Sequence, residues 1–186
     1  YDCDSLALEK VTNFLKVFLK SFEKINNAYL EVRTKSTNID VFKSIKPMKN
    51  VIIAFSLNPE IIVKEFEQKT PTLKKRINSI NSLQKLGWQV GLRFDPLINY
   101  SKNKLIYKKF FHFIFNKIQV EKIHSVTTGR FRMPNSFFNK LVNIRPEDSL
   151  VFNKLKNEKL LEYQTQKKEC EEELIKFIDY KKLFVN

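Results

Sequence analysis

The chain has 186 residues, of which 42% are hydrophobic, a size that supports one hydrophobic core and leaves little room for a second. No apolar run approaches the roughly 18 residues of a membrane-spanning helix, which excludes an integral membrane protein and predicts no membrane partner. The formal net charge of +14 suits a partner that carries phosphates, but an excess of Lys beside abundant Asn, Ile and Phe equally fits a genome of biased composition.

The cysteines and the first residues indicate the cellular context. Cys3 and Cys170 lie far apart in the chain without a CxxC spacing, so the sequence predicts neither a zinc site nor a disulfide framework. A reducing, cytoplasmic location is therefore expected. The chain begins at Tyr1 and runs directly into an amphipathic segment, so we expect a part of a longer protein with no targeting segment in front of it.

The predicted elements alternate between helices and strands. Asp4 is expected to cap a first helix that ends at Asn26-Asn27 and carries apolar residues at helical spacing: Leu8, Val11, Leu15, Phe18, Leu19 and Phe22. Short runs rich in Val, Ile, Leu or Phe predict strands at residues 28–33, 51–55, 89–94 and 122–127. Further helices are predicted at residues 71–86, between an N-cap at Thr70 and a left-handed C-cap at Gly87, and at residues 104–118, 136–142 and 157–178.

This alternation predicts an α/β fold with a parallel sheet, either an open doubly wound sheet or an arc of a (β/α) barrel. In both architectures the functional groups lie at the C-terminal ends of the strands. Polar residues follow each predicted strand at that end: Thr34-Lys35-Ser36, Ser56 with Asn58 and Pro59, Asp95-Pro96, and Thr128-Gly129. Their recurrence indicates a binding site at one rim of the sheet.

Each of these residues also has a purely structural interpretation, which the sequence leaves open. Lys35 is compatible with an ordinary solvated lysine. Ser56 and Asn58 are favoured N-cap residues for a helix with Pro59 in its first turn. Asp95 before a proline is a common start of a turn.

A more specific signal comes from three strand segments in fixed order and spacing: residues 30–36 (LEVRTKS), 54–59 (AFSLNP) and 91–96 (GLRFDP). Together with the connecting run 66–76 (FEQKTPTLKKR) and the helix start 4–9 (DSLALE), they resemble the spore photoproduct lyase and DNA-repair-photolyase-like branch of radical S-adenosylmethionine enzymes. The resemblance covers residues 4–132.

This resemblance implies a partial (β/α) barrel of the radical S-adenosylmethionine type. The chain is expected to be its C-terminal part, a single domain over residues 1–186 with barrel units in 1–132 and a helical region in 133–186. The first third of such a barrel carries a CxxxCxxC loop that binds a [4Fe–4S] cluster, and the chain contains no such loop. The cluster reduces S-adenosylmethionine to a 5′-deoxyadenosyl radical.

The resemblance also assigns roles to individual residues. Lys35 and Ser56 match positions that contact the methionine moiety of S-adenosylmethionine, and Asn58 is a further cofactor-binding candidate at the same rim. Arg93 and Asp95 match a strong family motif, either as substrate-binding residues or as an arginine–aspartate pair that organises loops.

Two further candidates concern the substrate. The family uses a cysteine just before the first helix as hydrogen donor; Tyr1 stands at the aligned position, and Cys3, two residues on, is the candidate that replaces it. Arg130 and Arg132, after the fourth predicted strand, are candidates for substrate contacts.

The resemblance therefore implies the C-terminal part of a spore photoproduct lyase-like enzyme that repairs DNA, which is expected to be inactive without the cluster-binding segment. Two alternatives stay open: a degenerate homologue, and a non-catalytic basic module that binds nucleic acid. In such a module, Arg130 and Arg132, Lys108-Lys109 and Lys74-Lys75-Arg76 would contact phosphates.

Overall fold

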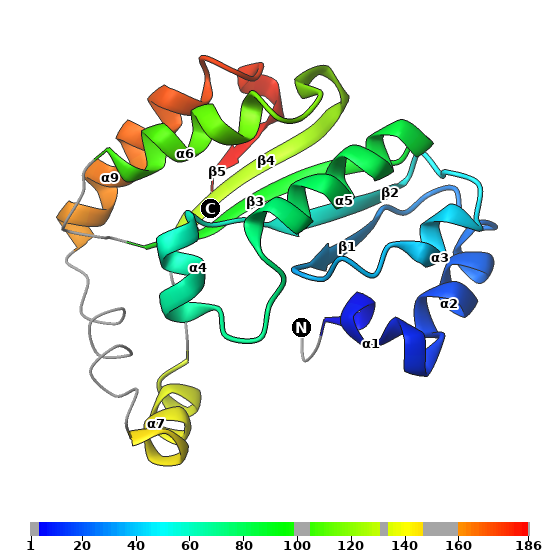
Figure 1. The fold of residues 1–186 in the computed structure, drawn as a ribbon, viewed down its shortest axis with the longest axis horizontal. Coiled ribbons are helices and arrows are strands. Elements are labelled where there is room, and N and C mark those ends of the chain that lie inside the picture. The colour runs from blue at the N-terminus through cyan, green and yellow to red at the C-terminus, as the bar shows by residue number, and fades with distance from the viewer. Residues whose placement is uncertain (1–3, 99–104, 131–133, 147–159, 186) are drawn as a thin grey trace.

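The computed structural model describes residues 4–98, 105–130, 134–146 and 160–185. Within these ranges one sheet holds five parallel strands that follow the order of the chain: β1 (Leu30–Thr34), β2 (Val51–Ser56), β3 (Gln89–Leu97), β4 (Ile123–Arg130) and β5 (Leu183–Val185) (Figure 1). Because the strand order never reverses, the sheet lacks the switch point of a doubly wound fold and has the order of an arc of a (β/α) barrel. The predicted α/β class with a parallel sheet is confirmed.

Helices fill the connections between the strands, as predicted. They are α1 (Ser5–Thr12) and α2 (Phe14–Phe22) before β1, α3 (Asp40–Lys43) before β2, α4 (Glu60–Phe66) and α5 (Leu73–Leu86) before β3, α6 (Ile106–Phe115) and the short η1 (Val120–Lys122) before β4, and α7 (Asn135–Ile144), α9 (Leu160–Leu174) and the short η3 (Tyr180–Lys182) before β5. In Figure 1, α5 lies in front of the sheet, and α6 and α9 lie side by side.

The single helix predicted before β1 is wrong, because the chain breaks it at Asn13, which adopts a left-handed φ of 50°. Glu9 explains the break. Its buried carboxylate accepts hydrogen bonds from the backbone N–H groups of Leu15 (2.7 Å) and Lys16 (3.0 Å), and so serves the free N-terminus of α2. The apolar pattern had suggested one face, but Val11 is 84% exposed.

Other element boundaries differ for local reasons. Thr72, rather than Thr70, caps α5 by accepting from the N–H of Lys75, whereas Gly87 takes the predicted left-handed C-cap conformation with φ 89°. β3 continues through Asp95-Pro96 to Leu97 instead of ending before them. The unpredicted α3 and β5 have four and three residues, too few for a hydrophobic period to show.

The helix-covered face of the sheet carries the hydrophobic core. Side chains alternate along each strand, and those on this face are buried: Val32, Ile53, Phe55, Leu92, Phe94 and Val126. They form one cluster with residues of the helices: Ile77, Ile80 and Leu83 of α5, Phe110, Phe111 and Ile114 of α6, and Leu174 of α9. Residues 160–185 thus contribute to the core and add β5 to the sheet.

The opposite face, called the inner face below, is polar. Arg93 of β3 is 2% exposed, and its guanidinium donates to the Glu31 carboxylate (Nη2 to Oε2, 2.6 Å; Nε to Oε1, 3.1 Å). It also donates to Oγ of Ser125 (3.1 Å) and to the carbonyl oxygen of Leu92 (3.1 Å). Burial alone would raise the pKa of the Glu31 carboxyl, but the hydrogen bonds and charges of Arg93 and Arg33 hold that pKa below its usual value.

Glycine makes room for these side chains on the inner face. A Cβ at Gly91 would lie 2.8 Å from both terminal nitrogens of Arg93, and one at Gly129 would lie 3.0 Å from Cγ of Asp95. Each charged group therefore lies against the bare backbone of a glycine.

None of the helices in the described residues is long and apolar enough to cross a membrane.

We expect Gly91→Ala to lower the free energy of unfolding by about 1–3 kcal/mol, because the new methyl group pushes the Arg93 guanidinium away from Glu31 and Ser125. Urea denaturation of the purified protein measures this change. An unchanged free energy of unfolding would show that Arg93 moves aside without loss, and would contradict the role assigned to this glycine.

Candidate functional site

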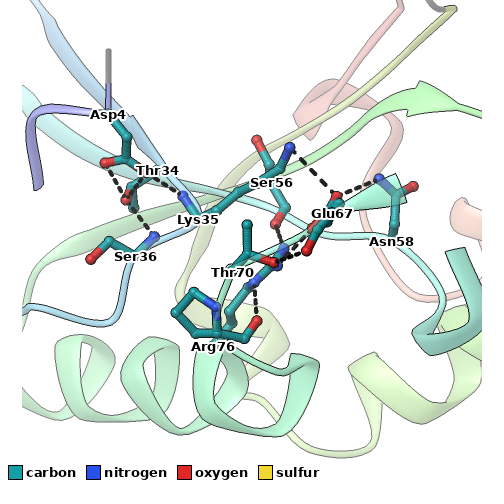
Figure 2. Close-up of polar contacts among 10 residues, drawn as sticks. Asp4, Thr34, Lys35, Ser36, Ser56, Asn58, Glu67, Thr70 and Arg76 are labelled. Atoms are coloured by element: carbon teal, nitrogen blue, oxygen red, sulfur yellow. Dashed lines mark hydrogen bonds and ion pairs between the residues drawn. The ribbon is translucent and has the colours of Figure 1, made fainter. Parts of the chain in front are cut away.

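The candidate site lies where β1 and β2 end. The two strands pair in parallel, with Thr34 opposite Phe55, so Lys35 and Ser56 follow that pair at neighbouring strand ends. Ser56 in turn pairs with Arg93 of β3. The structure therefore brings together two of the predicted cofactor-binding residues, as the sequence suggested, and Figure 2 shows Asn58 close to the same rim. Their roles stay predictions.

Asp4 fixes the backbone at the end of β1. Its carboxylate caps α1 by accepting from the N–H of Ala7 (3.1 Å), and it also accepts from Oγ1 of Thr34 (2.8 Å) and from the N–H of Lys35 (2.8 Å). Thr34 Oγ1 then accepts from the N–H of Ser36 (2.8 Å). The sequence predicted only the cap. These three hydrogen bonds to the Asp4 carboxylate hold the start of α1 against the end of β1 and against Lys35, which carries the candidate cation.

The side chain of Lys35 extends from this anchor towards Glu67. Its Nζ lies 3.5 Å from Oε1 of Glu67, and 39% of the side chain is exposed. A contact of this length is a loose ion pair rather than a short hydrogen bond, so the ammonium keeps capacity to donate to a ligand. Lys35 is therefore a partly exposed lysine beside a buried carboxylate, and its role as a cofactor contact stays a prediction.

Glu67 belongs to a buried network that sequence reasoning missed. Its Oε2 accepts from Nη2 of Arg76 (2.6 Å), and its Oε1 accepts from Nδ2 of Asn58 (3.1 Å). Arg76 is completely buried and also donates to the carbonyl oxygens of Ser56 (3.0 Å) and Pro71 (2.9 Å) and to Oγ1 of Thr70 (2.8 Å). Figure 2 shows these contacts converging on the end of β2.

This network corrects two expectations from the sequence. Arg76 has no exposed surface, so it cannot be the phosphate contact that the basic run Lys74-Lys75-Arg76 suggested. Ser56 and Asn58 do not cap the next helix, because Pro59 occupies the N-cap of α4 and no side chain bonds there. The run 66–76 contained the signal, but nothing in it showed that its Glu and Arg pair with each other.

The predicted pair between Arg93 and Asp95 is also absent. Arg93 is paired with Glu31, and Asp95 instead lies 3.6 Å from Nη1 of Arg33. The donors of Arg93 are directed at groups of the protein, which favours its structural interpretation over contact with a substrate. Asp95 retains 19% exposure of its side chain on the inner face.

The remaining candidates cannot be placed. Tyr1, Cys3 and Arg132 lie outside the described residues, and Arg130 ends β4 without a described side chain. The second cysteine, Cys170, is buried in α9, and desolvation raises the pKa of its thiol to about 12. It is therefore a core residue and not a thiolate ligand.

The chain's residues do not fit an iron–sulfur cluster. Such a cluster needs three cysteine thiolates from one loop in this enzyme class, whereas the sequence contains two cysteines that are far apart. Among the described residues no three His, Cys, Asp or Glu side chains are grouped to hold a metal ion.

Comparison with known proteins gives the family. The family model for spore photoproduct lyase matches residues 2–168. The spore photoproduct lyase of Clostridium acetobutylicum is 23% identical over 148 residues, which cover 79% of this chain and 44% of that protein. The spore photoproduct lyase of Bacillus subtilis (strain 168) is 27% identical over 94 residues, covering 50% and 28%. The chain thus spans less than half the length of these curated relatives.

Solved structures show the same fold. A spore photoproduct lyase complexed with a dinucleoside spore photoproduct matches with a TM-score of 0.80 and 14% identity, over 98% of this chain and 57% of that one. A mutant of the enzyme with bound AdoMet and dinucleoside spore photoproduct matches with a TM-score of 0.77 and 12% identity over the same shares. Because the family model covers most of the sequence, the chain belongs to the spore photoproduct lyase family of radical S-adenosylmethionine enzymes.

Proposed function

We propose that this chain is the C-terminal part of a radical S-adenosylmethionine lyase that repairs a DNA photoproduct, and that Lys35, Ser56 and Asn58 contact the cofactor. The observation that carries the proposal is the Lys35 ammonium, held at the end of β1 beside the end of β2. Ligands of parallel α/β barrels bind at this edge of the sheet. The family match makes S-adenosylmethionine the ligand to test.

The polar groups at this rim fit the methionine moiety of S-adenosylmethionine. Lys35 supplies a partly exposed cation that suits the carboxylate. Asn58 is 2% exposed, and its Oδ1 has no hydrogen-bond partner among the described residues, so it can accept from a donor group of a ligand. Ser56 can both donate and accept. When bound to a reduced cluster, the cofactor supplies the 5′-deoxyadenosyl radical.

Two parts of the proposal concern groups beyond this rim. The cluster is bound by cysteines outside the 186 residues, since the chain lacks the ligands for it. Cys3, next in sequence to Asp4, is the proposed hydrogen donor in place of the residue that aligns with Tyr1. The proposed catalysis therefore requires the cluster-binding cysteines of a longer protein, whereas the proposed hydrogen donor lies within this chain.

DNA is the proposed partner of the complete protein. The net charge of +14 favours a polyanion, and the solved neighbours are bound to a dinucleoside spore photoproduct. Among the described lysines, Lys74, Lys75, Lys108 and Lys109 are exposed and so can reach a phosphate backbone.

The experiment that tests the proposed function uses the full-length protein, reconstituted anaerobically with its cluster and given a reductant. We expect conversion of a dinucleoside spore photoproduct to the undamaged dinucleoside, measured by chromatography. If S-adenosylmethionine is cleaved while the dinucleoside stays intact, the proposed substrate is wrong. If neither is consumed, the enzyme assignment fails.

The 186-residue chain alone is expected to behave differently. After anaerobic incubation with iron and sulfide it should show no visible absorption from a [4Fe–4S] cluster and should form no 5′-deoxyadenosine, because two distant thiols cannot hold the cluster. Detection of 5′-deoxyadenosine from the purified chain would overturn the ligand count.

Lys35→Ala in the full-length protein should weaken the binding of S-adenosylmethionine by about 1.5–3 kcal/mol, because a charged hydrogen bond is lost. Equilibrium dialysis with labelled cofactor measures the dissociation constant. Lys43→Ala is the matched control, since it removes an equally charged side chain that pairs with Asp40 on the surface. Equal affinities for both variants would remove Lys35 from the site.

A further inference from the structure

Glu67 occupies a central position between the candidate cofactor contacts and the interior of the protein. It follows α4 directly, its backbone N–H donates to the carbonyl oxygen of Val63 (2.9 Å), and its side chain is 6% exposed. The backbone of Glu67 is thus fixed by the helix, and its carboxylate is largely buried. A carboxylate this buried must have its charge matched by partners.

The two carboxylate oxygens have different partners. Oε2 faces inwards and accepts from Nη2 of Arg76 (2.6 Å). Oε1 faces the rim, where it accepts from Nδ2 of Asn58 (3.1 Å) and lies 3.5 Å from Nζ of Lys35. Figure 2 shows Lys35 and Asn58 reaching this carboxylate from opposite sides. One residue therefore contacts two of the three proposed cofactor contacts.

Arg76 fixes the position of this carboxylate relative to the end of β2. Its guanidinium donates to the backbone of Ser56 at the end of β2 and to the backbone of Pro71 just before α5. The Glu67 carboxylate is therefore held at a fixed position relative to the strand end. Asn58 Nδ2 and Lys35 Nζ, which contact Oε1, are therefore positioned relative to the same strand end.

The bond to Glu67 also decides which end of the Asn58 carboxamide faces a ligand. A carboxylate accepts only, so the carboxamide must present its Nδ2 to Glu67 and its Oδ1 elsewhere. That Oδ1 is buried and has no partner among the described residues. An acceptor without a partner in an otherwise closed network is the arrangement expected where a ligand donates.

We propose that Glu67 is a positioning residue of the S-adenosylmethionine site, which holds the Lys35 ammonium at the rim and keeps Asn58 Oδ1 directed to a donor group of the cofactor. This inference rests on the proposed function. It adds a residue that need not touch the cofactor and that acts through two residues that do.

The charge of Glu67 by itself works against this role, because a carboxylate repels the carboxylate of the cofactor. Arg76 neutralises that charge at 2.6 Å, so Arg76, Glu67 and Lys35 together carry one positive charge. Removing the negative charge would raise the attraction for an anion, whereas removing the acceptor would release Lys35 and Asn58. The two effects have opposite signs, so the direction in which the affinity for S-adenosylmethionine changes shows which of them dominates.

Glu67→Gln makes the test. The buried guanidinium of Arg76 takes the amide oxygen, so the amide nitrogen faces Asn58 Nδ2 and Lys35 Nζ, which are donors as well. Asn58 is then expected to turn its carboxamide and Lys35 to move into solvent. In the full-length protein with oxidised cluster, the dissociation constant of S-adenosylmethionine should rise on the order of 10-fold.

Thr70→Val is the matched control. Thr70 supports the same network, since its Oγ1 accepts from Arg76 (2.8 Å) and donates to the backbone oxygen of Glu67 (2.8 Å), but it contacts neither Lys35 nor Asn58 in the described contacts. For the Thr70→Val variant, we expect the dissociation constant of S-adenosylmethionine to stay within about twofold of the wild-type value. If Thr70→Val lowers the affinity for S-adenosylmethionine as much as Glu67→Gln does, the effect comes from general disruption of the buried network, and the positioning role is overturned.

A double variant tests whether Glu67 acts through Lys35. If it does, adding Glu67→Gln to Lys35→Ala should raise the dissociation constant by less than the product of the two single effects. If the dissociation constant of the double variant rises by the full product of the two single effects, Glu67 does not act through Lys35. Unchanged or tighter binding by Glu67→Gln, alongside weaker binding by Lys35→Ala, would refute the inference while leaving the proposed function intact.

Two further measurements keep the outcome decisive. Absence of cofactor binding by the wild-type protein would overturn the proposed function and this inference together. If a melting curve shows that Glu67→Gln does not fold, Glu67→Asp replaces it, because the shorter side chain keeps a charge for Arg76 and withdraws from the rim. Wild-type affinity in Glu67→Asp would contradict the inference.

Discussion

The buried ion pair between Arg76 and Glu67 is the interaction on which the rim depends. A guanidinium with no exposed surface has lost its hydration entirely, and only a full set of acceptors makes its burial tolerable. The chain supplies them from the end of β2 and from residues 67–71, which connect α4 to α5. Satisfying one arginine thus ties together three elements whose ends surround the candidate site.

The two faces of the sheet carry different kinds of side chain. The helix-covered face is apolar and continuous with the core, while the inner face carries Glu31, Arg33, Arg93 and Asp95. Charged side chains can lie flat on that face because glycine leaves space beside them. Ala54 is also fully buried between those strands yet does not belong to the core cluster. The ion pairs of Glu31 with Arg93 and of Arg33 with Asp95 therefore lie on the inner face, outside the apolar core.

Much of the fold could be predicted from local pattern alone. Buried strands of a parallel sheet read as short apolar runs, and Gly87 ends α5 where a left-handed residue was expected. The break at Asn13 could not be foreseen, because it depends on the Glu9 carboxylate bonding to a helix five residues later. Similarly, Arg76 looked like one more cation in a basic run, and its partner lies nine residues away on another element. Pairing partners are tertiary information that composition and spacing do not contain.

The candidate contacts are organised by residues from the same N-terminal part of the chain. Asp4 and Thr34 fix the backbone of Lys35, while Glu67, which is held by Arg76, contacts its side chain and that of Asn58. All of these groups lie between residues 4 and 76, in the first two βα units of the sheet and in the helix cap that precedes them. The rim is therefore ordered by the same contacts that fold these units, before any ligand arrives. Because the side-chain entropy is lost during folding, a ligand that binds there does not have to order the site, which is the physical basis of preorganisation.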